Sequence, residues 1–466
     1  MVLKQFFSAR DMIPQHRICG EIPSSSTAYR TAFAMAWPSA MESFLVALVG
    51  VVDTIMVGEL GPEAISAVGI TNQPKLIVLA VILSLNVGIT AITARRKGEN
   101  DSDSANHCLR QGIILSALLA FVLGTLAFIY APWLMDFSGA GNDILADSVL
   151  YFRIILVGNF FYSVSLTINA AQRGVGNTKI SMVTNMTANL VNLVFNYLLI
   201  NGRFGFPRWG VAGAAVATAL GNLIAFLLSV HSILVPGHFL CLKRTDSWRI
   251  DMDTVRHILP IAAGAGTEQL ITRFGLFFYA KILAGLGTMA FAASQIVINM
   301  QNISFSFGEG LGFSSAALVG QNLGAGRPDL SIMYGKVSQR IGLVISCFLC
   351  TMFIIFRHPI VAIFNDNPEV LALAAPLMVI TGIICIPNVS GHLFAGSLRG
   401  AGDVRYVAFI SFVSLGIIRP FLSWILCYPL GLGLIGAWYG LLADQMCRFL
   451  LYMHRFYSGK WTEIKV

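Results

Sequence analysis

The stretch "MESFLVALVGVVDTIMVG" (residues 41–58) is apolar almost throughout, yet it contains two carboxylates, Glu42 and Asp53. Its hydrophobicity is typical of a helix that crosses a lipid bilayer. A charged group near the centre of such a helix costs roughly 2.5–3.5 kcal/mol on insertion scales, so intramembrane acids usually mark functional sites or paired charges. The two acids are about three helical turns apart and lie on one face.

The rest of the chain has the same character. Its 466 residues are 56% hydrophobic and 12% charged, which excludes an ordinary soluble globular protein. Apolar runs long enough to cross about 30 Å of hydrocarbon recur throughout. We therefore predict an all-α polytopic membrane protein with twelve transmembrane helices, at residues 31–57, 64–93, 111–133, 148–172, 181–202, 211–235, 258–284, 289–318, 338–357, 371–397, 406–429 and 436–453.

The orientation of the chain in the membrane can be predicted from its Lys and Arg residues, because these are enriched in cytoplasmic loops. They are concentrated in the 94–110 and 242–256 loops and in the two tails, so both termini are expected in the cytoplasm. The net charge of +8 is then a topology signal, and nucleic-acid binding is not expected. The first thirty residues lack the apolar core of a cleavable signal peptide. The eight cysteines lie in predicted spans or on the inner side, and we predict neither a disulfide nor a metal site.

The chain matches itself after a shift of 226 residues. "QRGVGNTK" (172–179) aligns with "LRGAGDVR" (398–405), and Glu42 aligns with Glu268. The short RGxG turns need glycine at positive φ, and their arginines are expected at lipid headgroups. The repeat predicts two six-helix lobes in the same orientation, an arrangement typical of transporters that alternate access around a central cavity. The predicted divisions are an N-terminal tail (1–30), an N-terminal lobe (31–235), a linker (236–257), a C-terminal lobe (258–454) and a C-terminal tail (455–466).

Seven stretches along nearly the whole chain carry a resemblance to a known family, among them "VDTIMVGELGPEAISAVGI" (52–70), "NLVNLVFNYLLI" (189–200), "GVAGAAVATALGN" (210–222) and "ALVGQNLGAGRPD" (317–329). In this order and spacing, the chain resembles the multidrug and toxic compound extrusion (MATE) transporters. The resemblance implies two six-helix lobes in a bacterial inner membrane, with export of organic compounds in exchange for Na⁺ or H⁺. No GxxxxGK[ST] phosphate loop is present, so an ion gradient is the expected energy source, and no cofactor beyond the coupling ion is expected.

The first candidate site is built around Asp53. Asn192 and Asn196 are four residues apart on the fifth span and share a face, and Thr218 lies on the sixth span. A carboxylate, two amide oxygens and a hydroxyl suit Na⁺, or they can hold a protonated Asp53 by hydrogen bonds. The resemblance points to the same four positions, although some family members have Asp where Asn196 stands. The alternative is that the asparagines only join helices by hydrogen bonds.

The second candidate site is Glu268, which the resemblance implies in ion coupling or in binding cationic substrates. The family's partner acid on the tenth helix corresponds to Asn388 here, which weakens this site. His392, one turn later, could carry a proton near neutral pH or simply be bonded to a carbonyl. An ion pair with Arg273 would make Glu268 structural. Glu42, its repeat partner, is expected to be the lesser and more structural companion of Asp53.

Substrate contacts are harder to predict. Aromatic faces and carboxylates bind drug-like cations, so Tyr162, Phe274 and Tyr279 are candidates to line a cleft, although such aromatics more often pack. Intramembrane acids and amides equal or outnumber Arg273 and Lys281, which favours cationic or neutral organic compounds. A lipid-linked oligosaccharide flippase, the alternative, would need a strongly basic cavity. No catalytic constellation is visible, so an enzyme is not expected. Small organic molecules and the bilayer are the expected partners of a functional monomer.

Overall fold

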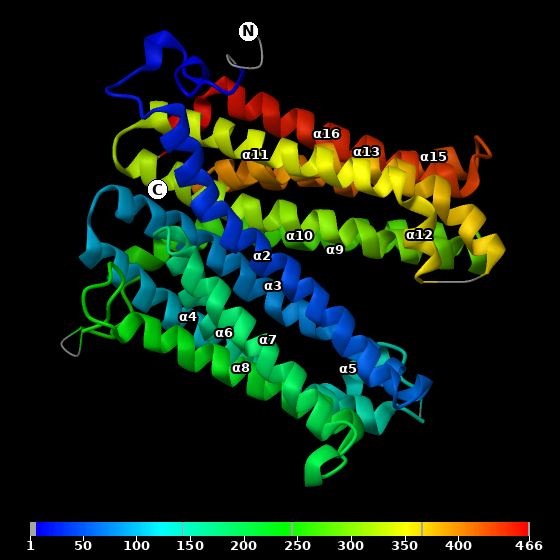
Figure 1. Ribbon diagram of the computed structural model, residues 1–466. Helices are drawn as coiled ribbons and strands as arrows, with labels where there is room; N and C mark the ends of the chain where they lie inside the picture. Colours follow the sequence, from blue (N-terminus) through cyan, green and yellow to red (C-terminus); the bar gives the residue numbers. More distant parts are fainter. Residues whose placement is uncertain (1–5, 142, 244–245, 365–366, 465–466) are drawn as a thin grey trace. The chain divides into compact units, whose positions relative to one another are not determined.

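The computed structural model describes residues 6–141, 143–243, 246–364 and 367–464, and these contain helices and no strand (Figure 1). Two short 3₁₀ helices come first, η1 (Arg10–Met12) and η2 (Gln15–Arg17). The first half of the chain then forms α2 (Ser25–Gly58), α3 (Pro62–Gly98), α4 (Ser102–Ile129), α5 (Ala131–Phe137), α6 (Leu145–Gly174), α7 (Thr178–Leu199), η3 (Arg203–Gly205) and α8 (Gly210–Leu234). The second half forms α9 (Met252–Ala284), α10 (Thr288–Gly324), α11 (Pro328–Ile355), α12 (Arg357–Ala362), α13 (Pro368–Gly400), α14 (Val404–Ser411), the π-helix η4 (Phe412–Ile418), α15 (Arg419–Cys427), α16 (Gly433–Ser458) and η5 (Lys460–Glu463).

The predicted all-α membrane fold is confirmed. Most predicted spans fall on one long helix, whereas the third runs from α4 into α5, the ninth reaches the start of α12, and the eleventh covers the continuous run α14–η4–α15. Within the described residues, eight helices are long and apolar enough to cross a membrane by length and composition. The π-helical interruption of the eleventh span has a local cause. Pro420 has no backbone N–H to continue the ladder, and the wider π-turns of η4 lie directly before it.

The sequence repeat is visible in the helix ends. Helix α3 begins at Pro62 and ends at Gly98, and α10 begins at Thr288 and ends at Gly324, so both ends are displaced by the predicted offset of 226 residues. The same offset relates α4 to α11, and it relates the ends of α6 and α13. The glycines of the two RGxG turns share one backbone conformation, with φ of 88° at Gly176 and 89° at Gly402, as predicted.

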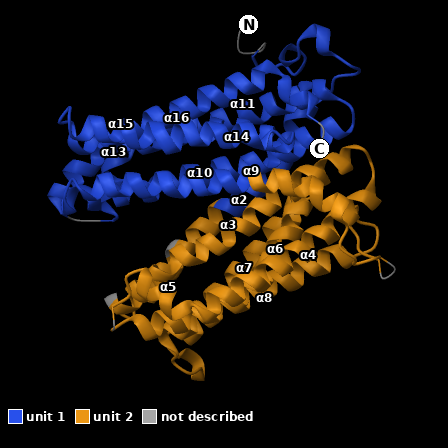
Figure 2. Ribbon diagram, turned by 180° about the vertical axis from the view of Figure 1, so that it is seen from behind, with its two compact units in different colours: residues 1–43, 264–466 blue, residues 44–263 orange. Residues whose placement is uncertain are grey.

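The chain forms two compact units, residues 44–263 and residues 1–43 with 264–466 (Figure 2). The unit of residues 1–43 and 264–466 contains the first part of α2, a segment that the sequence pattern assigns to the N-terminal lobe. Four alanines at four-residue spacing explain this packing, because small side chains let helices approach closely. Ala28 and Ala32 join a cluster with residues of α11, and Ala36 and Ala40 join one with residues of α10 and α13.

The first part of α9 behaves in the corresponding way. Residues 252–263 belong to the unit of residues 44–263, where Ile258 and Ile261 lie against Gly88 on α3. Each unit therefore contains the first part of a long helix whose remainder belongs to the other unit. The two helices that are divided in this way, α2 and α9, are related by the 226-residue repeat.

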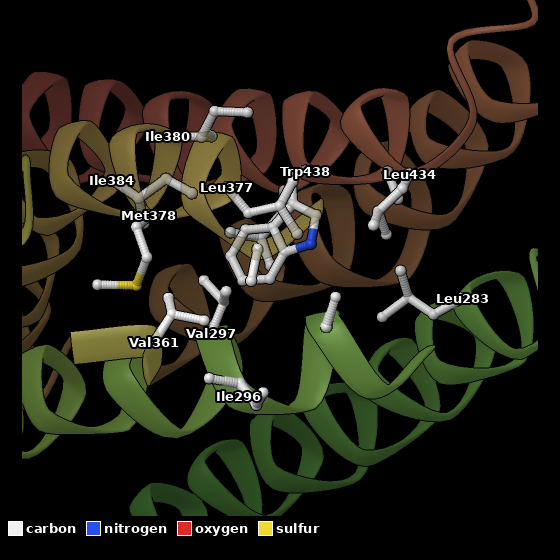
Figure 3. Close-up of a cluster of buried hydrophobic side chains, with 14 of the residues drawn as sticks. Leu283, Ile296, Val297, Val361, Leu377, Met378, Ile380, Ile384, Leu434 and Trp438 are labelled. Carbon is white, nitrogen blue, oxygen red and sulfur yellow. The ribbon is translucent and has the colours of Figure 1, made fainter. Parts of the chain in front are cut away.

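The core of the unit that contains the C-terminal half is centred on Trp438 of α16 (Figure 3). Its fully buried indole packs among Val297 of α10 and Leu377 of α13, and its Nε1 donates to Ser294 Oγ at 3.4 Å. This layer fixes α10, α13 and α16 against one another. It thereby positions the polar residues that lie further along the same helices, among them Asn388 and Asp444.

Candidate functional site

The structure brings the four residues of the first candidate site into one hydrogen-bonded cluster. Asn196 Nδ2 donates to Asp53 Oδ1 at 2.8 Å. The hydrogen-bonding pattern also turns the Asn192 amide nitrogen toward Asp53, at 2.9 and 3.1 Å from its two carboxylate oxygens. In this orientation the Asn192 carbonyl oxygen accepts from Thr218 Oγ1 at 3.1 Å. The contact between these residues is thus observed, and their part in ion coupling stays a prediction.

The helices explain why these side chains meet. Asn192 and Asn196 are one turn apart on α7, and both are buried, with 6% and 1% of their surface exposed. Gly221 on α8 packs directly on the backbone of α7 at Ala188, which draws the two helices together one turn from Thr218. Asp53 lies on α2, five residues before its end at Gly58.

The shell around Asp53 has one unsatisfied atom. Both amides present N–H groups to the carboxylate, whereas the Oδ1 atom of Asn196 is buried without a hydrogen-bond partner among the described residues. A buried acceptor left without a donor is costly. An acceptor oxygen beside a carboxylate can receive a cation or the O–H of a protonated acid, so the cluster has the chemistry to bind a monovalent cation.

The site has a further charged residue, Lys75 on α3, which the sequence-based prediction did not include. Its ammonium lies within electrostatic reach of the Asp53 carboxylate. Tyr151 on α6 also interacts electrostatically with Asp53. The signal for Lys75 was available, because a lysine inside the apolar run "PKLIVLAVILSL" (74–85) is as unusual as the acids in α2.

In the second half, Glu268 is paired with Arg399. The Glu268 carboxylate lies 2.5 Å from Arg399 Nη2 and 3.3 Å from its Nε, and Ser411 Oγ approaches it at 3.4 Å. The partner is therefore not Arg273, which five-residue spacing places on a different face of α9. Arg399 is the RGxG arginine that we expect at the lipid headgroups, and the structure gives it a partly buried acid of the neighbouring helix α9 as its partner.

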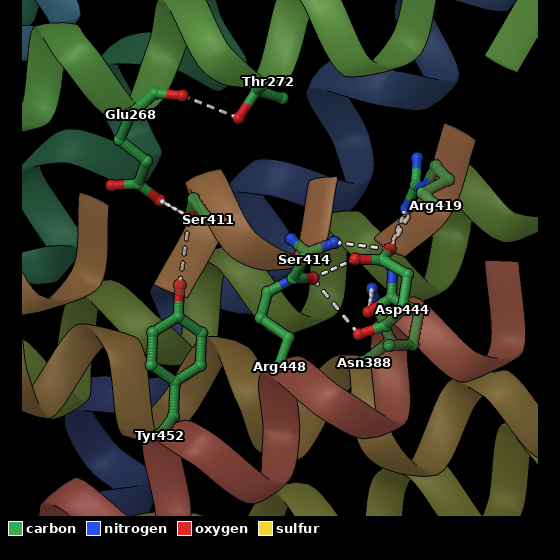
Figure 4. Close-up of polar contacts among 10 residues, drawn as sticks. Glu268, Thr272, Asn388, Ser411, Ser414, Arg419, Asp444, Arg448 and Tyr452 are labelled. Atoms are coloured by element: carbon green, nitrogen blue, oxygen red, sulfur yellow. Dashed lines mark hydrogen bonds and ion pairs between the residues drawn. The ribbon is translucent and has the colours of Figure 1, made fainter. Parts of the chain in front are cut away.

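A second charge cluster lies beside the first (Figure 4). Asp444 on α16 is fully buried and is bound by Arg419 at 2.5 Å and Arg448 at 2.9 Å. Ser414 in the π-helix η4 also donates to this carboxylate. Two arginines and a hydroxyl thus surround one acid, which joins α15 and η4 to α16.

The other residues of the predicted second site have contacts of their own. Asn388 accepts from Ser304 Oγ at 3.5 Å and donates to Gln445 Oε1 at 3.3 Å, linking α13 to α10 and α16. The His392 ring packs edge-on against Phe305, with ring centroids 4.6 Å apart. These contacts do not involve Glu268, and the part of Asn388 and His392 in the second site stays a prediction.

The candidate substrate residues occupy different environments. Phe274 on α9 is exposed, Tyr162 on α6 is half-buried, and Glu42 on α2 is buried. Tyr279 lies inside the hydrophobic cluster around Trp438, so it packs in the core and does not line an open surface. No group of three or more His, Cys, Asp or Glu side chains in the described ranges is placed to hold a metal ion.

The linker before α9 is fastened to α4. Arg110 pairs with Asp246 at 2.6 Å, and His107 Nε2 lies 3.0 Å from Asp251 Oδ2. Hydrogen bonds from Thr254 and His107 lower the pKa of Asp251 from its ordinary value to about 2. Beside these contacts is a cavity of about 370 Å³, lined by residues that include Arg96, His107 and Arg110.

Comparison with known proteins agrees with the geometry. The model of the MatE family matches residues 38–198 and 265–425, one segment in each repeat. A probable multidrug resistance protein NorM of Thermotoga maritima is 27% identical, with 92% of each chain covered. The multidrug resistance protein MdtK of Photorhabdus laumondii is 29% identical over 93% of this chain and 95% of its own. An outward-facing multidrug resistance MATE transporter superposes with a TM-score of 0.87 at 19% identity, covering 93% of this chain and 97% of that chain, which shows a shared fold.

Proposed function

The chain belongs to the MatE family of multidrug and toxic compound extrusion transporters, and from this premise we propose that it is a secondary antiporter. It exports organic, cationic or amphipathic drug-like compounds in exchange for Na⁺ or H⁺, by alternating access. The observation that carries the proposal is the Asp53 carboxylate, held inside a membrane helix bundle by the amides of Asn192 and Asn196. The membership makes the protein a transporter, not an enzyme.

The relatives support the substrate class. NorM and MdtK are named multidrug resistance proteins. These names favour export of varied small organic molecules, and the lipid-linked oligosaccharide flippase alternative finds no support among them. The bacterial relatives are consistent with a multi-pass inner-membrane protein. Cytoplasmic termini and action as a monomer are parts of the proposal.

The Asp53 cluster suggests how an ion could be coupled to transport. A proton or Na⁺ bound at Asp53 removes its negative charge, and the amide N–H groups that donated to the carboxylate lose much of their attraction. Coupling requires that the ion bind one conformation of the protein better than the other. One elementary charge moving through 100 mV supplies about 2.3 kcal/mol, enough to concentrate a substrate roughly 50-fold.

Efflux from reconstituted vesicles tests the proposal. Proteoliposomes are equilibrated with ethidium or a fluoroquinolone at the same concentration on both sides, and a Na⁺ gradient or a pH gradient is imposed separately at constant membrane potential. We expect one of the two gradients to drive substrate against its own concentration gradient, and its dissipation by an ionophore to stop the movement. A rate of substrate flux that is the same with and without each ion gradient would contradict antiport.

A further inference from the structure

Helix α3 carries a lysine deep in its apolar run. Lys75 is thirteen residues from the start of the helix at Pro62 and is half-buried. A charged amine at such a depth is expensive unless a counter-charge or water compensates it. Its position in the repeat, 226 residues later on α10, is occupied by Gln301. The fold shared by the two halves therefore does not require this charge, which belongs to the first half alone.

The short connection between α2 and α3 brings Lys75 and Asp53 into the same region of the fold. Helix α2 ends at Gly58 and α3 begins at Pro62, so the two helices are joined by a short turn. At 1.5 Å per residue, Asp53 lies about 8 Å and Lys75 about 20 Å from this turn. Side chains on a helix tilt toward its N-terminus, and the N-terminus of α3 is at the turn. The long Lys75 side chain therefore extends toward the level of Asp53.

The two charges act on one another. Asp53 is the acid that interacts electrostatically with Lys75, and Lys75 is the cation that interacts with Asp53. The other groups at this carboxylate are Asn192 and Asn196 of α7, with Thr218 behind Asn192, and Tyr151 of α6 within electrostatic reach. These side chains are uncharged in the neutral pH range, so Lys75 alone among them brings a positive charge to the site.

We propose that Lys75 is a tethered cation that competes with the coupling ion for Asp53. This inference rests on the proposed function of Asp53 as the coupling acid. When the ion leaves, the Lys75 ammonium balances the carboxylate, and when an ion binds, Lys75 loses its counter-charge. The lysine thereby lowers the affinity of the site for its ion and favours release. A site with one acid and one amine is neutral when empty, so it holds its ion less tightly than the acid alone would.

Substitution of Lys75 measures this competition. Lys75→Gln removes the charge and introduces the residue found at the repeat position, and Lys75→Arg keeps the charge. The readout is the concentration of Na⁺ or of H⁺ that gives half-maximal efflux from proteoliposomes, measured for each ion separately. We expect Lys75→Gln to lower this concentration about tenfold or more for the ion that drives transport, since opposite unit charges within about 10 Å of one another inside a protein interact by roughly the equivalent of tenfold. Lys75→Arg should stay within about twofold of wild type.

Two outcomes would overturn the inference. An unchanged half-maximal ion concentration in Lys75→Gln would mean that Lys75 does not compete, and an equal shift in Lys75→Arg would mean that shape and not charge is responsible. Lys75→Met, which also removes the charge, gives the same measurement if the glutamine variant is poorly folded, as judged by size-exclusion chromatography.

Asp53→Asn separates this inference from the proposed function. If that variant retains ion-driven efflux, the coupling role of Asp53 fails together with everything built on it. If Asp53→Asn abolishes ion-driven efflux while Lys75→Gln leaves the half-maximal ion concentration unchanged, the antiport proposal stands and only the role of Lys75 is wrong.

Discussion

The Arg399 guanidinium, at the end of α13, donates to the Glu268 carboxylate of α9 with an Nη2–Oε1 distance of 2.5 Å. An acid with a fixed cationic partner can bind a coupling ion only after that partner moves away. Asp53 differs, because its hydrogen bonds come from neutral amides, and Lys75 interacts with it electrostatically without a direct ion pair among the described residues. This contrast between the two halves makes Asp53 the better candidate for the coupling acid and Glu268 a residue that joins helices.

Removal of Arg399 tests the structural role of the pair. We expect Arg399→Gln to lower the free energy of unfolding by about 2 kcal/mol, because Glu268 would keep its charge in a partly buried site without a partner. The double variant Glu268→Gln/Arg399→Gln should recover part of this loss. Thermal unfolding in detergent measures both, and strictly additive effects would show that the two side chains do not interact in solution.

The Asp444 cluster should be more sensitive. Asp444 is fully buried, and both Arg419 and Arg448 depend on it. Asp444→Asn leaves two buried cations with one neutral partner, for which we expect a loss of about 3–5 kcal/mol in the same unfolding measurement. Asp103→Asn is the matched control, since the Asp103 side chain is 91% exposed and should contribute at most about 1 kcal/mol. Equal effects of the two substitutions would rule out a structural role for the cluster.

The contact between the linker and α4 is expected to depend on pH. The pKa of Asp251 is about 2, below its ordinary value, so its stabilising contribution is complete above pH ~4 and is lost as the pH falls toward 2. Asp251→Asn should therefore loosen the linker already at neutral pH. Hydrogen-exchange mass spectrometry of residues 246–256 reports this, with Asp253→Asn, whose side chain is exposed, as the control. Exchange that is unaffected by Asp251→Asn would contradict the fastening of the linker to α4.

The predicted orientation can be tested at Cys19, which is exposed near the N-terminus. With the other cysteines replaced, Cys19 should resist a membrane-impermeant maleimide in intact cells and react in inverted vesicles. Cys108 also lies on the predicted inner side, but the structure shows it buried, so it should react slowly in both preparations. Labelling of Cys19 in intact cells would show that the N-terminus faces outward and would overturn the predicted orientation.

The sequence predicted the parts of this molecule that depend on periodicity. Hydropathy located the spans, the 226-residue offset anticipated the helix ends, and four-residue spacing placed Asn192 beside Asn196. The partner of Glu268 was missed because an arginine in a turn motif reads equally well as a headgroup contact, and only packing decides between the two. The alanine stripe from Ala28 to Ala40 was visible, but nothing in the sequence says against which helices such a stripe packs.

The last prediction concerns the two acids of α2. Asp53 is surrounded by the amides of Asn192 and Asn196, and its charge state decides how strongly they are held. Asp53→Asn imitates a permanently neutralised acid, so the site can no longer distinguish an ion-bound from an ion-free state. We expect gradient-driven efflux to be abolished while folding and part of the substrate binding remain, since the substitution is nearly isosteric and replaces a charge with a group that can still hydrogen-bond.

Glu42→Gln should reduce efflux without abolishing it, because Glu42 lies three turns away on α2 and outside this shell. Glu59→Gln is the control for loss of an acid, as Glu59 is exposed beyond the end of α2 and bonds only to Asn201 among the described residues. Efflux against a concentration gradient in proteoliposomes, together with ethidium binding in detergent, distinguishes the three variants. If Asp53→Asn still pumped at the wild-type rate, the coupling acid would have to be sought at Glu268, where Arg399 must first be displaced.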